Sequence, residues 1–117
     1  MAKREAPGQF EQVVLTAVLT LGDDAYGVSI FKKAQEVVGS RSISLGAVYV
    51  TLDRMEDKGY LTSWLSDPTP ERGGRAKRRY KLQPPGETAL QESAATARRI
   101  WDAIAGALGP GWLAARN

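Results

Sequence analysis

The side chains in this sequence with the clearest chemical role are lysines and arginines, which can bind anions, and several of them lie in one short segment. Residues 72–81 read RGGRAKRRYK, with several cations, a glycine pair and no acid. Such a segment can neutralise phosphates, and its glycines let the backbone approach a sugar–phosphate chain closely. The alternative is a solvated or disordered run of charge. Strand-like sequence on either side favours a basic hairpin instead.

Catalytic and metal chemistry find little support in the sequence. The chain contains no cysteine and no histidine, which excludes disulfides, thiol nucleophiles, the usual zinc sites and histidine-dependent triads. Its close carboxylate pairs, Asp23–Asp24 and Glu56–Asp57, are better explained by helix capping and surface charge. We therefore expect no enzyme activity, no metal and no cofactor.

Composition places the chain among ordinary globular proteins. It has 117 residues, of which 43% are hydrophobic and 25% charged, enough for one domain with a useful core. The net charge of +3 is modest, so the distribution of charge says more about partners than its total does. No apolar run approaches the roughly 20 residues that span a bilayer, and no secretory apolar segment follows the basic start. We expect a cytoplasmic protein with no membrane association.

The spacing of apolar residues predicts two helices near the start of the chain. Residues 10–21 carry them at helical intervals, and a glycine ends this helix. A second helix is expected over 25–38, with Asp23 and Asp24 as cap candidates. Gly27 is costly so early in a helix, and close approach by another helix is the favoured reason, a hinge the alternative. The inner face of the second helix is expected to hold Tyr26, Ile30, Ala34 and Val37.

A third helix is expected over 45–58, and it follows the second after a short turn. Either Ser42 or Ser44 can cap it. Two helices joined in this way form the layout of a helix-turn-helix. Its inward stripe is predicted to be Val48, Leu52 and Met55.

The hydrophobic period then changes from helical to alternating, which indicates strands over 61–66 and 76–82. Between them, residues 67–74 are dense in proline, glycine and aspartate and cannot form regular structure. The two strands therefore make a hairpin with a basic wing over 67–79.

A long final helix is expected from Pro85 to Leu108, and paired prolines at 84 and 85 suit its first turn. Its apolar residues recur at alternating steps of four and three, as in the seam of a coiled coil. The seam could fold back on the first helix of its own chain, but the length of the helix favours a partner chain.

Together these elements predict a fold that is mainly α with a small β-hairpin: a winged helix-turn-helix plus a long C-terminal dimerisation helix. The expected divisions are a flexible N-terminal arm over 1–9, the DNA-binding domain over 10–83, the dimerisation helix over 84–108 and a flexible tail over 109–117.

The third helix is the expected recognition helix, because a helix fits the major groove and its first residues reach base edges. Tyr49 is expected to be exposed and to donate to a phosphate. Ser44 is expected to cap the helix, to donate to a phosphate, or to do both. Arg54 is either a DNA contact or a surface ion-pair residue. The full set of expected DNA contacts is Ser42, Ser44, Gly46, Tyr49 and Arg54 in and before the helix, with Arg72, Gly73, Gly74, Arg75, Lys77 and Arg78 in the wing; Val50 is a further position of interest.

Dimerisation is expected to use the seam of the final helix together with part of the first helix. A two-fold dimer would present two recognition helices to a palindromic operator. Trp101 and Trp112 could line a pocket for a flat effector, although a large aromatic on a seam is more often packing. The expected interface is Phe10, Val14, Leu90, Ala94, Ala97, Trp101, Ile104 and Leu108.

Three stretches of the sequence resemble one known family. They are FEQVVLTAVLTLGDDAYGVSI (10–30), SLGAVYVTLDRMEDKGYLTS (44–63) and PTPERGGRAKRRYKL (68–82), in this order and spacing. They resemble the PadR family of bacterial transcriptional regulators, in the short branch with a single C-terminal helix. The departure is Gln83–Pro84, where the family often has a threonine that caps the last helix.

The resemblance implies a dimeric DNA-binding regulator, usually a repressor, that dimerises through its final helix. It implies a DNA contact for Tyr49 and, in the wing, for Arg75 and Arg78. Some members release DNA when they bind phenolic acids or hydrophobic drugs, so a hydrophobic or aromatic effector is a partner to consider. The alternative from a different class is a winged-helix protein-interaction module without DNA binding, which would predict a neutral or acidic wing.

Overall fold

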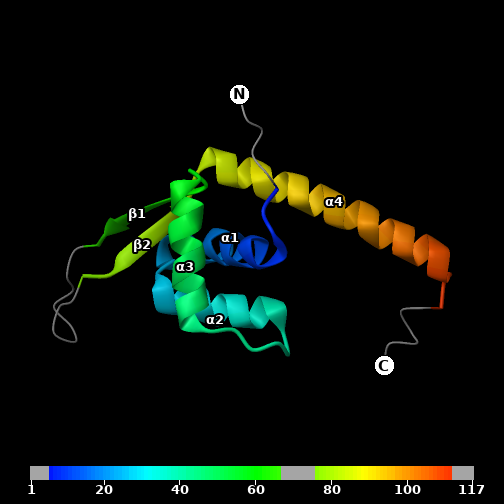
Figure 1. Cartoon of the computed structure of the whole chain (residues 1–117), viewed down its shortest axis with the longest axis horizontal. Helices are drawn as coiled ribbons and strands as arrows, with labels where there is room; N and C mark the ends of the chain where they lie inside the picture. The colour runs from blue at the N-terminus through cyan, green and yellow to red at the C-terminus, as the bar shows by residue number, and fades with distance from the viewer. Residues whose placement is uncertain (1–5, 67–75, 112–117) are drawn as a thin grey trace.

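The chain folds as a small helical domain with a two-stranded hairpin and one long projecting helix (Figure 1). The computed structural model describes residues 6–66 and 76–111. Within them no helix is long and apolar enough to cross a membrane. The predicted winged helix-turn-helix is confirmed. In chain order the elements are α1 (Gln9–Leu21), the 3-10 helix η1 (Gly22–Asp24), α2 (Gly27–Val38), α3 (Leu45–Asp57), β1 (Leu61–Leu65), β2 (Arg78–Leu82) and α4 (Pro84–Leu108).

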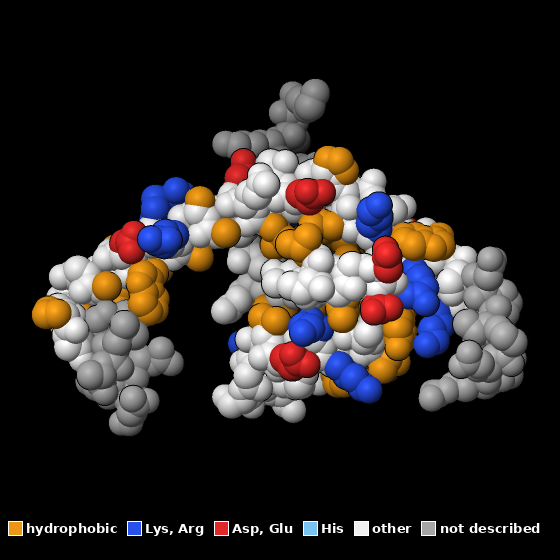
Figure 2. Space-filling model, turned by 180° about the vertical axis from the view of Figure 1, so that it is seen from behind, with side chains coloured by type: hydrophobic (Ala, Val, Ile, Leu, Met, Phe, Trp, Pro, Cys, Tyr) orange, Lys and Arg blue, Asp and Glu red, His pale blue; other side chains and the backbone are white. Residues whose placement is uncertain are grey.

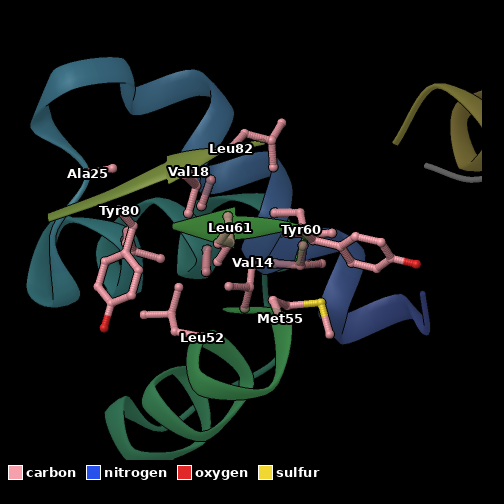
Figure 3. Close-up of a cluster of buried hydrophobic side chains, with 14 of the residues drawn as sticks. Val14, Val18, Ala25, Leu52, Met55, Tyr60, Leu61, Tyr80 and Leu82 are labelled. Atoms are coloured by element: carbon pink, nitrogen blue, oxygen red, sulfur yellow. The ribbon is translucent and has the colours of Figure 1, made fainter. Parts of the chain in front are cut away.

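One core holds α1, α2, α3 and the hairpin together. The predicted inward stripe of α3 is confirmed, because Val48, Leu52 and Met55 are fully buried. Figure 3 shows Leu52 and Met55 facing Val14 of α1. The hairpin closes the core from the side with Leu61, Tyr80 and Leu82.

The second helix starts later than predicted. Asp23 and Asp24 lie in η1, and α2 begins at Gly27 after an extended Tyr26. The Ser29 hydroxyl, and neither aspartate, accepts a hydrogen bond from the Tyr26 N–H at 3.0 Å. The cause is long-range pairing: the Tyr80 N–H donates to the Ala25 carbonyl at 2.9 Å, which holds this segment extended beside β2.

The inner face of α2 also differs from the prediction at two positions, because Tyr26 lies before the helix and is only half-buried, and the last turn faces the core through another residue. Ile30 and Ala34 are fully buried, whereas Val37 is exposed and the neighbouring Val38 packs against the core instead. The last turn of α2 therefore faces the core through the residue four positions after Ala34, not three.

The recognition-helix candidate α3 has its cap at Ser44, whose hydroxyl accepts from the Ala47 N–H at 3.1 Å. This resolves the choice between Ser42 and Ser44 as the cap of α3.

The hairpin strands pair antiparallel in the register Leu61↔Leu82 and Ser63↔Tyr80. The second strand begins at Arg78, two residues later than predicted.

The last helix lies beside the body of the molecule along its first half, where residues as far as Ile100 line a hollow with Pro7 and Gln12. Gln83 precedes it without a side-chain cap, and the helix begins at Pro84, one residue earlier than predicted. Gly86 and Ala89 are buried and Leu90 packs against the core. The rest of α4 extends away from the body of the molecule (Figure 1).

Candidate nucleic-acid interface

Three elements converge on one face: the first turns of α2 and α3, and the base of the wing. They enclose a hollow of about 490 Å³. It brings together the predicted Tyr49, Lys77 and Arg78. Its other lining residues are Tyr26, Gly27, Val28, Lys32 and Ala76. The sequence predicted none of them as a DNA contact, although it marked Tyr26 as an inner-face residue and Gly27 as a point of close approach.

Tyr49 lies across the first turn of α2. Its side chain is 41% exposed, as predicted. A Cβ built on Gly27 would overlap the Tyr49 phenol oxygen and ring, so only glycine leaves room for the ring in this position. The expectation that Gly27 permits a close approach is confirmed, and the approaching group is the Tyr49 side chain. Gly27 therefore orients Tyr49 toward the wing base.

Replacing Gly27 with alanine is expected to weaken DNA binding while leaving the fold intact. The exposed tip of the Tyr49 ring can swing away, so the melting temperature should change little. The phenol would then lose the phosphate contact expected for it, at a cost of about tenfold in affinity, the effect of one hydrogen bond to a charged group. Fluorescence anisotropy with a labelled duplex measures this. Adding Gly27→Ala to a Tyr49→Ala chain should cost nothing further; an additive loss would refute the link.

The base of the wing is held against η1 and Tyr26, just before α2, by several contacts, and one further bond lies within the hairpin. The Lys77 ammonium lies 4.1 Å from the centre of the Tyr26 ring. The Arg79 guanidinium donates to the Asp23 carbonyl at 2.6 Å, and Arg79 forms a β-bridge with Tyr26. The Arg78 guanidinium donates to the Ser63 hydroxyl at 3.0 Å. These contacts fix where the hairpin leaves the domain, and Figure 2 shows cationic side chains gathered on this side of the body.

Arg54 belongs to a different surface. Its guanidinium donates to the Glu11 carboxylate at 3.2 Å, and the Lys58 ammonium lies 3.8 Å from the same oxygen. Burial raises the pKa of Glu11, but the hydrogen bonds from Gly8 and Arg54 and the two nearby charges together hold it below its ordinary value. Of the two readings of Arg54, the structure supports the ion pair. Its partner, Glu11, is on α1.

The remaining predicted contacts divide into exposed residues and residues outside the described part of the chain. Ser42, Ser44 and Gly46 are exposed around the start of α3. The Ser44 hydroxyl accepts its cap bond and keeps its own hydrogen to donate. Within residues 6–66 and 76–111, no three potential metal ligands form a group. The wing-tip predictions Arg72, Gly73, Gly74 and Arg75 lie outside the described residues.

The predicted seam of α4 is exposed along its outer half. Trp101 and Ile104 are each 43% exposed and Leu108 is 62% exposed. Figure 2 shows hydrophobic side chains along this arm, with charged side chains on its other side. Ala94 and Ala97 are also exposed, while Leu90 and Phe10 are partly buried against the core. Val14 is a correction: it is fully buried inside its own domain and has no surface to offer a partner.

The fold and this surface define a winged helix-turn-helix protein. A family model, the transcriptional regulator PadR-like family, matches residues 15–92. The chain therefore belongs to the PadR-like family of transcriptional regulators, a class that binds DNA and is not enzymatic. A search of curated proteins found no match.

Solved structures with this fold include other regulators. A PadR family transcription regulator from hypervirulent Clostridium difficile R20291 is 25% identical, with a TM-score of 0.70 over 87% of this chain and 100% of that chain. A PadR-like regulator from Bacillus cereus strain ATCC 14579 is 19% identical, with a TM-score of 0.69 over 86% and 91%. Bordetella bronchiseptica BpsR, whose DNA binding is regulated by 6-hydroxynicotinic acid, is 22% identical, with a TM-score of 0.66 over 92% and 68%.

Proposed function

We propose that the protein is a dimeric repressor that binds a palindromic operator, with α3 in the major groove and the wing on the phosphates or in the minor groove. The observation that carries the proposal is the shared hollow of Tyr49, Lys77 and Arg78. It groups hydrogen-bond donors and cations from the recognition helix and the wing on one face. A helix and a basic hairpin that face the same way suit adjacent grooves of one duplex.

Charge supports the same orientation. Lys32 from α2 adds to the wing cations around the hollow, and no acidic residue is among the lining residues that the structure describes. A protein-interaction module would not require such a concentration of positive charge. A repressor of this kind acts where the chromosome is, so we place the chain in the cytoplasm.

The dimer part of the proposal rests on the arm of α4. An amphipathic helix that projects from a small domain leaves its apolar side in water unless a second copy covers it. Two copies related by a two-fold axis would cover both arms with one isologous interface. The two recognition helices would then face half-sites about one helical turn apart.

Binding is tested with purified protein and fluorescent duplex from its own upstream region, titrated at several salt concentrations against a scrambled duplex. We expect sequence-preferring, salt-sensitive binding by two chains per site. If the upstream region fails, a random-sequence duplex library follows, and failure of that library would overturn the proposal. Repression is tested by in vitro transcription from a promoter that overlaps the selected site, where activation would contradict the repressor assignment.

Replacing Lys77 and Arg78 together with alanine is expected to weaken binding at every DNA sequence, by about tenfold or more at moderate salt. The slope of log affinity against log salt should flatten by about one for each phosphate contact removed. Cation–π contacts at exposed sites contribute only about 0.5–1 kcal/mol, so the fold should survive.

The matched control for the wing variant is Arg99→Glu, on the side of α4 away from the apolar seam. It changes the net charge by the same amount, and Arg99 contacts only Thr96 among the hydrogen bonds described. If both variants flatten the salt slope equally, the effect comes from net charge, and the wing has no special place at the DNA.

A further inference from the structure

The recognition helix has an unusual composition for a helix that reads bases. Its first nine residues, 45–53, read LGAVYVTLD and contain no arginine, lysine, asparagine or glutamine. Those four residue types make the bidentate hydrogen bonds that identify guanine and adenine in the major groove. If these turns of α3 read bases directly, they must therefore use contacts other than bidentate hydrogen bonds to guanine or adenine.

Several of the polar side chains around these turns already have partners within the protein or are buried. The Ser44 hydroxyl caps the helix through the Ala47 N–H. The Tyr49 ring is turned across Gly27 toward the wing base, where a phosphate contact suits it. Arg54, the first cation along the helix, is held by Glu11 of α1. Thr51 is buried.

Val50 also faces outward on these turns, next to the exposed Asp53. It is 57% exposed, more than any other large apolar residue of α3. It shares a helix face with Gly46, one turn earlier, and Asp53, about one turn later. Gly46 has no side chain, and a Cβ built on it would meet nothing within 4 Å. No side chain one turn before Val50 therefore stands between this helix face and the DNA. The helix can therefore approach the groove floor closely enough for a short, branched side chain to touch it.

We propose that Val50 recognises the C5-methyl group of a thymine in each half-site of the operator. An apolar side chain in the major groove distinguishes thymine by contact with this methyl group, which the other three standard bases lack. The cations around the neighbouring hollow, Lys32, Lys77 and Arg78, bring the duplex backbone to the same face. This inference rests on the proposed function and names the chemistry that α3 reads.

The test replaces thymines one at a time with deoxyuridine, which removes only the methyl group, in the tightest duplex selected from a random library. For the unaltered protein we expect one sensitive thymine per half-site, with about a fourfold loss of affinity, the effect of exposing one buried methyl group. Substitution in both half-sites should cost about fifteenfold. A duplex in which no thymine is sensitive would overturn the proposal.

The matching protein variant is Val50→Ala, which shortens the side chain at an exposed position and should leave the melting temperature nearly unchanged. It should bind the thymine and uracil duplexes with equal affinity, close to that of the unaltered protein for the uracil duplex. Leu19→Ala, which shortens another exposed apolar residue on α1, should keep the full discrimination. If Val50→Ala still prefers thymine fourfold, a different group reads the methyl. Failure of the unaltered protein to bind any duplex would instead overturn the proposed function.

Discussion

Trp101→Glu is expected to give a monomer that loses at least about 100-fold in affinity for a palindromic duplex, because two linked half-site contacts become one. Trp101 lies on the projecting half of α4, on the same side as Ile104 and Leu108. A carboxylate inside a dry helix–helix seam would lose its hydration without gaining a partner, and that cost is several kcal/mol. Sedimentation velocity measures the mass, and anisotropy measures the affinity.

The control for the dimer variant is Ala95→Glu, which adds the same charge to the same helix on the side away from most of the seam. Ala95 is exposed, and a glutamate there would precede Arg99 by four residues, a favourable helical pair. We expect this variant to remain dimeric. A dimer of unaltered strength in Trp101→Glu, at concentrations near the operator affinity, would show that the arm does not hold the two chains together.

Gly86→Ala is expected to destabilise the protein by about 1–3 kcal/mol, the usual cost of overfilling a packed site. A Cβ there would overlap the backbone carbonyl oxygen of Tyr60 and lie 2.9 Å from a Leu82 methyl group. That carbonyl also accepts from the Gln83 N–H at 2.9 Å, so it cannot move without breaking the bond at the start of α4. Thermal and urea unfolding at fixed protein concentration measure the change in the free energy of unfolding.

Gly106→Ala is the matched control in the same helix. A Cβ on Gly106 would meet nothing within 4 Å, so only the helix preference of alanine should matter. That preference should stabilise the chain by about 0.5–1 kcal/mol. The two substitutions are chemically identical and are expected to have opposite signs. If Gly86→Ala stabilises as Gly106→Ala does, the contact with Tyr60 is looser than the structure shows.

Local sequence was sufficient to identify most elements and the inward face of α3. The stripe of Val48, Leu52 and Met55 repeats at helical spacing, so its burial could be predicted without knowing what lies opposite. The same reasoning failed at the start of α2. There Asp23 and Asp24 are good local caps, but pairing of Ala25 with Tyr80 holds the chain extended. A contact between residues far apart in sequence outweighed a capping preference of about 1 kcal/mol.

The candidate site shows the same division. Helical spacing and residue type marked Tyr49 and the wing cations as surface groups. They could not show that Gly27 turns Tyr49 toward the wing, or that Lys32 joins the same hollow. The choice between the two readings of Arg54 and the burial of Val14 could not be predicted for a related reason: both residues lie on helices whose neighbours were unknown. Glu11 of α1 binds one and the domain core encloses the other.

By itself, then, the sequence determined which segments are helices or strands, where the basic wing lies, and the family to which the chain belongs. These follow from periodicity, turn residues and short motifs, all of which are local along the chain. Only the tertiary structure decided which exposed residues share a face. The reason is physical: packing of helices and pairing of strands bring together residues from distant segments. The meeting of Tyr49 with Gly27, and of α2 with the wing, is a property of that packing alone.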